Sequence, residues 1–184
     1  MEHRISLHLD GSFCFLLALM LLLLPLTWVL AAAVAVLVHE AFHAAAIVLL
    51  GGRIYALHFG SGGIRMETDT LPSGKEIIAA MAGPLGSAIL FLLAPWLPRI
   101  AICGAVHCIY NLLPLFPMDG GRILRSAIAL CAPGKKGSAI FNFTQKSLYL
   151  ILCGLIVFAG FRWGILPIAA GIVFLWSQRK VRTV

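Results

Sequence analysis

Long apolar runs separated by short polar segments extend along the chain, and their lengths predict its architecture. Residues 13–50 are almost unbroken apolar sequence, which is too long for one membrane span of about 20 residues and suits two. Pro25 offers the break between them, because proline cannot continue a helix interior. Later runs predict four more spans. The six expected spans cover about residues 12–26, 29–50, 76–97, 100–117, 147–161 and 163–177.

The segments around these spans differ in character. Residues 51–75 are rich in glycine and alternate in polarity at 53–59 and 64–68, which predicts two short strands around a glycine turn. Residues 120–146 form a basic, partly amphipathic connector, and Gly83-Pro84 is expected to interrupt the third span. The pattern predicts an all-α polytopic membrane protein with about six transmembrane helices. A short membrane-associated β-hairpin is expected between the second and third.

The composition agrees with a chain whose solvent is lipid. Of the 184 residues, 61% are hydrophobic and 11% charged, and the mean hydropathy is +1.00. A soluble domain has about half apolar and a quarter charged residues, so a soluble enzyme is excluded, as is a disordered chain. The five cysteines contain no C-x-x-C pair, and we interpret them as small buried hydrophobic residues.

The net charge of +7 is explained by membrane topology rather than by nucleic acid, because the basic residues lie between apolar runs. With the N-terminus inside, twelve of the 14 basic residues fall in cytosolic segments, and only Arg99 and Arg162 fall outside. Cytosolic loops are normally enriched in Lys and Arg. The distribution predicts that both termini are cytosolic, and no nucleic acid partner is expected.

Glu40 is an acidic residue inside a predicted span, where ionisable groups are costly. It belongs to the H-E-x-x-H sequence that runs from His39 to His43. Residues four apart on a helix differ by about 40° in direction, so both imidazoles can bind one metal ion. Glu40 projects from nearly the same side, where it could hold a water molecule for general-base catalysis. A chance match to the H-E-x-x-H pattern is the weaker alternative. Three polar groups in one apolar helix are costly to bury unless a partner such as a metal ion compensates for them.

Asp119 is the candidate for the third protein ligand that a catalytic zinc requires. It lies in the segment 111–121, where Pro114 and Pro117 break the helix and Gly120-Gly121 is expected to let the backbone turn tightly. On chemistry alone, an interfacial turn aspartate paired with Arg122 is an equal alternative. The predicted topology favours a ligand, because the second and fourth spans both run inward and bring Asp119 to the depth of the histidines.

The two motifs together resemble those of the intramembrane zinc metalloproteases of the site-2 protease family. That family has H-E-x-x-H in one span and an N-x-x-P-x-x-P-x-D-G segment in a later one. The resemblance covers about residues 30–125, and Gly83-Pro84 is similar to the family's break in the intervening span. Ala41-Phe42 departs from the small residue and glycine that often precede the second histidine. The chain is most similar to the sporulation-type branch, which cleaves membrane-tethered precursors of transcription regulators.

The resemblance implies that His39, His43 and Asp119 hold one zinc ion, and that Glu40 activates water and then protonates the leaving amine. It gives Asn111 a role in binding substrate or polarising the scissile carbonyl, with helix-end hydrogen bonding as an equal alternative. It implies a zinc metalloendopeptidase that hydrolyses peptide bonds of membrane-spanning or membrane-tethered proteins.

The same resemblance suggests a compact multi-pass protein of the bacterial cell membrane, with residues 1–184 as a single membrane-embedded protease domain. The implied partners are a membrane-tethered protein substrate and the lipid bilayer. A regulatory membrane protein is a further partner that the resemblance allows. Residues 51–70 are similar to membrane-associated strands that receive substrate in the family. Two other functions use the same residues. A small divalent-metal permease predicts ligands spread along the membrane normal, and a metal-binding scaffold has no need for Glu40.

Overall fold

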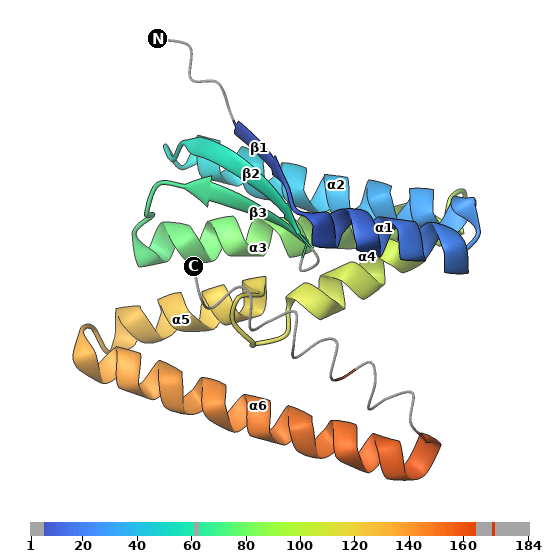
Figure 1. Cartoon of the computed structure of the whole chain (residues 1–184). Helices are drawn as coiled ribbons and strands as arrows, with labels where there is room; N and C mark the ends of the chain where they lie inside the picture. The colour runs from blue at the N-terminus through green and yellow to red at the C-terminus, as the bar shows by residue number, and fades with distance from the viewer. Residues whose placement is uncertain (1–5, 61–62, 165–170, 172–184) are drawn as a thin grey trace.

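The computed structural model describes residues 6–60, 63–164 and 171, and within them the chain is mostly helical with one small sheet (Figure 1). The strands are β1 (Ser6–Leu9), β2 (Ile54–Gly60) and β3 (Gly63–Thr68). The helices are α1 (Gly11–Leu23), α2 (Leu26–Leu49), α3 (Ser73–Ile89), the 3-10 helix η1 (Leu90–Leu93), α4 (Pro98–Asn111), α5 (Asp119–Cys131) and α6 (Lys135–Trp163).

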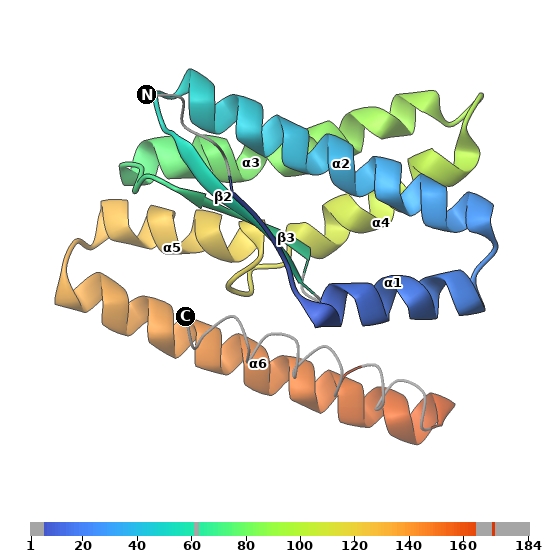
Figure 2. The same cartoon turned by 45° about the horizontal axis from the view of Figure 1, so that its top comes forward.

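Helices α2, α3 and α4 pack against one another and form the centre of the structure (Figure 2). The sheet lies along one side of this group, α5 packs on α3, and α6 runs along α5 (Figures 1 and 2). Glycine on α3 allows α2 to pack closely, since a Cβ at Gly86 would lie 2.5 Å from Cγ of Phe42 on α2. The centre of the fold is therefore the α2–α3 interface, where the candidate ligands of α2 lie.

The hairpin predicted from residues 53–59 and 64–68 is confirmed as β2 and β3, but it is part of a three-stranded sheet of order β1-β2-β3. Strand β2 pairs antiparallel with β3, with His58 opposite Arg65, and parallel with β1, with His8 opposite His58. Strand β1 was not predicted, because four alternating residues are too few to indicate a strand and the strand they pair with lies about 50 positions away.

Three described helical segments are long and apolar enough to cross a membrane: Leu26–Leu49, Ser73–Leu93 and Lys135–Arg162. The predicted break at Pro25 is confirmed, because α1 ends at Leu23 and Pro25 caps the start of α2. Helix α1 is apolar but has only 13 residues. The fourth predicted span, 100–117, is shorter than expected, since α4 already ends at Asn111, before the two prolines of the following loop.

Two other boundaries differ from prediction. Helix α6 starts at Lys135, so the second half of the expected connector belongs to the helix that was predicted for 147–161. After Gly137 the connector contains no proline or glycine up to Lys146, so nothing stops the helix. Arg162 lies inside α6 and not in a loop. The sixth predicted span, 163–177, lies almost entirely outside the described residues.

Helix α3 also continues through Gly83-Pro84, although an interruption was predicted there. Proline removes one backbone hydrogen bond, and burial of this helix face against α2 compensates for the loss. The cysteines also differ from prediction. Those of the described chain are free and either exposed or half-buried, because apolar side chains of a membrane protein can face lipid instead of a core.

Candidate metal centre

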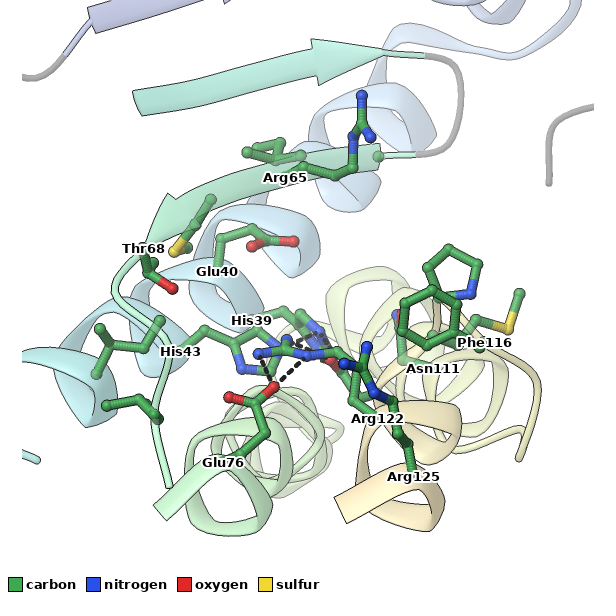
Figure 3. Close-up of a pocket in the computed structure, with 18 of the residues that line it drawn as sticks. His39, Glu40, His43, Arg65, Thr68, Glu76, Asn111, Phe116, Arg122 and Arg125 are labelled. Carbon is green, nitrogen blue, oxygen red and sulfur yellow. Dashed lines mark hydrogen bonds and ion pairs between the residues drawn. The ribbon is translucent and has the colours of Figure 1, made fainter. Parts of the chain in front are cut away.

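His39 and His43 project from adjacent turns of α2 into the centre of the fold (Figure 3). Asp119, the first residue of α5, meets them there. Asp119 Oδ2 lies 3.0 Å from Nε2 of each histidine, and the two Nε2 atoms are 3.1 Å apart. The three residues are buried, with exposed fractions of 2%, 4% and 5%. The structure thus brings Asp119 to two histidines that lie 76 and 80 positions before it in sequence.

The donor atoms suit zinc in both type and spacing. Tetrahedral zinc binds imidazole nitrogen and carboxylate oxygen at about 2.0–2.2 Å, which places ligand atoms about 3.3–3.5 Å apart. The three atoms here are 3.0–3.1 Å apart, so small side-chain movements create the required spacing. Of the described residues, these three form a His/Cys/Asp/Glu group whose ligand atoms all lie within 4.8 Å of one another. The residues therefore fit a single zinc ion.

Both imidazole rings are held by hydrogen bonds on the opposite nitrogen. His43 Nδ1 lies 2.7 Å from the carbonyl oxygen of Ala79, which can only accept, so Nδ1 carries a proton and Nε2 is the ring nitrogen that is directed at Asp119. His39 Nδ1 lies 2.8 Å from Oγ of Ser87, a fully buried residue of α3. Partners of this kind orient metal-binding histidines. Ser87 was not predicted from sequence; the available signal was a hydroxyl within the apolar stretch that follows Glu76.

Gly83 gives the imidazole of His43 its space. A Cβ at this position would lie 2.2 Å from His43 Nε2 and 2.6 Å from two ring carbons. No side chain can occupy that volume while the ring stays in place. The glycine before Pro84 therefore serves the site through close packing, rather than through the helix interruption predicted from sequence.

Asp119 is fixed by a chain of charged groups that reaches α3. Arg122 Nη1 donates to Asp119 Oδ1 at 3.2 Å, and its Nε and Nη2 donate to Glu76 Oε1 at 3.0 and 2.9 Å (Figure 3). Because Arg122 holds Oδ1, Oδ2 faces the histidines. The two interpretations of Asp119 from sequence, an arginine partner and a metal-directed carboxylate, are therefore compatible, each using a different oxygen.

Gly120 and Gly121 lie within the first turn of α5, and neither adopts a positive φ. The tight glycine turn predicted here is therefore wrong. Both glycines instead allow the loop of residues 112–118 to contact α5. A Cβ at Gly120 would lie 2.2 Å from the carbonyl oxygen of Leu112, and one at Gly121 would lie 2.4 Å from the amide nitrogen of Phe116.

Glu40 and Asn111 line the same cavity of about 690 Å³ as the three ligand candidates. Glu40 lies between the histidines and β3, and hydrogen-bonds to no described residue (Figure 3). Asn111 Nδ2 donates to the carbonyl oxygen of His107 at 3.0 Å, which is the helix-end bond that sequence analysis kept as an alternative. The ring of His107 packs edge-on against His39, with centroids 4.5 Å apart.

A family model described as Peptidase M50B-like matches residues 12–116, which is more than half of the chain. The chain belongs to this peptidase family. It is also 31% identical over 134 residues to "Zinc metalloprotease MJ0392" of Methanocaldococcus jannaschii, an alignment that covers 65% of this chain and 39% of that protein. The chain thus spans about two fifths of the length of this curated relative.

A solved structure, "Site-2 Protease from Methanocaldococcus jannaschii", has the same fold. It superposes with a TM-score of 0.72 at 23% sequence identity, covering 98% of this chain and 91% of the other. The fold similarity extends over the described helices and sheet. It agrees with the family resemblance inferred from the two sequence motifs.

Proposed function

We propose that this protein is an intramembrane zinc endopeptidase that hydrolyses peptide bonds of membrane-spanning or membrane-tethered proteins. The observation that carries the proposal is the convergence of His39, His43 and Asp119 on one buried point, with Glu40 beside them in the same cavity. Membership of the peptidase family supports the same chemistry. A permease is less well supported, because the three ligand atoms converge instead of spreading along a transit path.

In this proposal His39, His43 and Asp119 hold the zinc ion. Zinc, when bound, acts as a Lewis acid that polarises the scissile carbonyl and makes water a stronger nucleophile near neutral pH. Glu40 takes a proton from the attacking water and delivers it to the leaving amine nitrogen. Its carboxylate is suited to this role because it is half-buried and no described residue occupies it with a hydrogen bond.

The substrate is proposed to lie in an extended conformation between β3 and the metal centre. Residues of β3 line the cavity, and β3 is the last strand of the described sheet. A free strand edge can bind an extended peptide through backbone hydrogen bonds. Asn111 is proposed to polarise the scissile carbonyl, because its Nδ2 carries a second hydrogen beyond the one donated to His107.

We further propose a six-span topology with both termini in the cytosol and a single protease domain whose core is residues 30–125. The distribution of 14 basic residues supports this orientation. The site would then open toward the cytosolic half of the membrane. Assignment to the sporulation-type branch and to a bacterial membrane stays a prediction.

Cleavage of tethered substrates tests the proposed function. The full chain is purified in detergent, reconstituted with a panel of membrane-tethered candidate precursors, and assayed by gel before and after removal of metal with a chelator. We expect cleavage of at least one candidate, loss of cleavage after chelation, and recovery on addition of zinc. The His39→Ala/His43→Ala double variant serves as the control.

Cleavage that survives in the double variant would show that another protein or another site does the chemistry. The permease would be favoured if the zinc-loaded protein cleaved no candidate but transported zinc across the bilayer of a sealed vesicle. Both outcomes contradict the proposed endopeptidase.

A further inference from the structure

The loop of residues 112–118 joins α4 to α5, and two of its backbone groups are paired by one side chain of α6. Gln145 Oε1 accepts a hydrogen bond from the Phe116 amide at 2.9 Å, and Gln145 Nε2 donates to the Pro114 carbonyl at 2.9 Å. Gln145 is only 5% exposed, although most of α6 is exposed around it. One amide therefore satisfies both a donor and an acceptor of a loop that contains two prolines.

Two neighbours on the same face of α6 extend this contact. Tyr149 lies one turn after Gln145, and its hydroxyl donates to the carbonyl oxygen of Phe116 at 2.8 Å. Phe141 lies one turn before, and its ring packs edge-on against the Phe116 ring with centroids 6.2 Å apart. Residues 141, 145 and 149 share one helix face, since each step is four residues. We call these three residues the α6 grip.

The loop of residues 112–118, which the α6 grip contacts, is in direct contact with the first turn of α5, where Asp119 lies. The Phe116 amide nitrogen, which donates to Gln145, is also the atom that a Cβ at Gly121 would meet at 2.4 Å. On the other side, the carbonyl oxygen of Leu112 occupies the space beside Gly120. Backbone atoms in close contact cannot move aside by a change of rotamer, as a flexible side chain can. A shift of the loop would therefore displace the first turn of α5 and with it Asp119.

We propose that Gln145 is a positioning residue, which through the Phe116 backbone holds Asp119 at the distance from His39 and His43 that zinc binding requires. The proposal rests on the proposed function for the identity of the metal. Gln145 touches neither the metal centre nor the cavity, and it acts only through the loop. Helix α6 thereby supports the metal centre from outside, through its contact with the loop.

Replacing Gln145 with leucine tests this role by keeping the side-chain volume and removing both hydrogen bonds. The full chain in detergent is titrated with zinc against a competing chelator of known affinity, and cleavage kinetics are measured in parallel. Partners that orient metal ligands change metal affinity by about 10-fold to 100-fold when removed. We expect Gln145→Leu to weaken zinc binding by at least about 10-fold.

Asn142→Leu is the matched control, because Asn142 is an exposed amide on α6 one turn before Gln145. This variant also replaces a side-chain amide of α6 with leucine, but at a position outside the α6 grip. We expect its zinc affinity to equal that of the unmodified chain. A milder variant, Tyr149→Phe, removes one hydroxyl and keeps Gln145. We expect it to weaken zinc binding measurably, by less than Gln145→Leu.

Equal zinc affinities in Gln145→Leu and Asn142→Leu would overturn the proposal, as would a loss of thermal stability in Gln145→Leu with unchanged zinc affinity. If Gln145→Leu does not fold, Tyr149→Phe decides, and unchanged zinc affinity in that variant overturns the role of the grip. The endopeptidase proposal fails separately: the unmodified chain would then bind zinc and show the Gln145 effect, but cleave no substrate.

Discussion

Replacing Glu40 with glutamine is expected to slow cleavage by orders of magnitude while leaving zinc bound. Glutamine has nearly the same shape but cannot take a proton from water, and loss of a general base typically costs 10²–10⁴-fold in rate. Glu40 contributes none of the three clustered ligand atoms, so the metal centre keeps its donors. The measurement compares cleavage rate and zinc content on the same preparation, and we expect a rate loss of about 10²–10⁴-fold at unchanged zinc.

Glu67→Gln provides the matched control, because the Glu67 side chain is 64% exposed and, unlike its neighbours on β3, is not among the described residues that line the cavity. This variant should cleave at the rate of the unmodified chain. If Glu40→Gln retained that rate, the carboxylate would not be the base. If it lost zinc instead, Glu40 would be a ligand, and the division of roles proposed here would be wrong.

Replacing Gly83 with alanine is expected to disrupt the metal centre through a single methyl group. The new Cβ would lie 2.2 Å from His43 Nε2, so the ring must leave its position or the two helices must separate. A displacement of about 1 Å at a catalytic group can cost about 10²-fold in rate. We expect cleavage to fall by at least about that factor, together with weaker zinc binding in a chelator competition.

Gly154→Ala is the control for this substitution, since a Cβ at Gly154 inside α6 would meet no atom of the described residues within 4 Å. Alanine favours helix over glycine by about 0.5–1 kcal/mol, so this variant should be as stable as the unmodified chain or slightly more stable. Zinc affinity in Gly83→Ala equal to that in Gly154→Ala would contradict the role assigned to the glycine.

The part of the site that depends on local helix geometry could be predicted from sequence. His39, Glu40 and His43 lie on one helix, so their spacing alone places them on one side. Asp119 required the additional argument that two spans run in the same direction. Ser87 could not be assigned a role, and Gly83 was assigned the wrong one, because the importance of both depends on which face of α3 packs against α2.

The errors in the predicted fold have the same origin. Apolar runs predicted α2 and α3 well, because each run alone is long enough to indicate a helix. The pairing of β1 with β2 joins segments about 50 residues apart and leaves no local pattern. The hydrogen bonds from α6 to Phe116 likewise depend on tertiary contact, and the sequence there shows only a glutamine and a tyrosine near the start of an apolar run.

The most direct test of the central claim is the zinc content of the unmodified chain and of Asp119→Asn. The two proteins are purified identically, and the same helix content in both shows that both are folded. Asparagine can keep an oxygen facing Arg122, and its amide nitrogen then replaces the oxygen that faces both histidines. In either orientation the side chain has lost the negative charge of the carboxylate. We expect about one zinc per chain in the unmodified protein and a large loss in the variant, in line with three-ligand binding. Full zinc occupancy in Asp119→Asn would contradict the claim that Asp119 completes the site formed by His39 and His43.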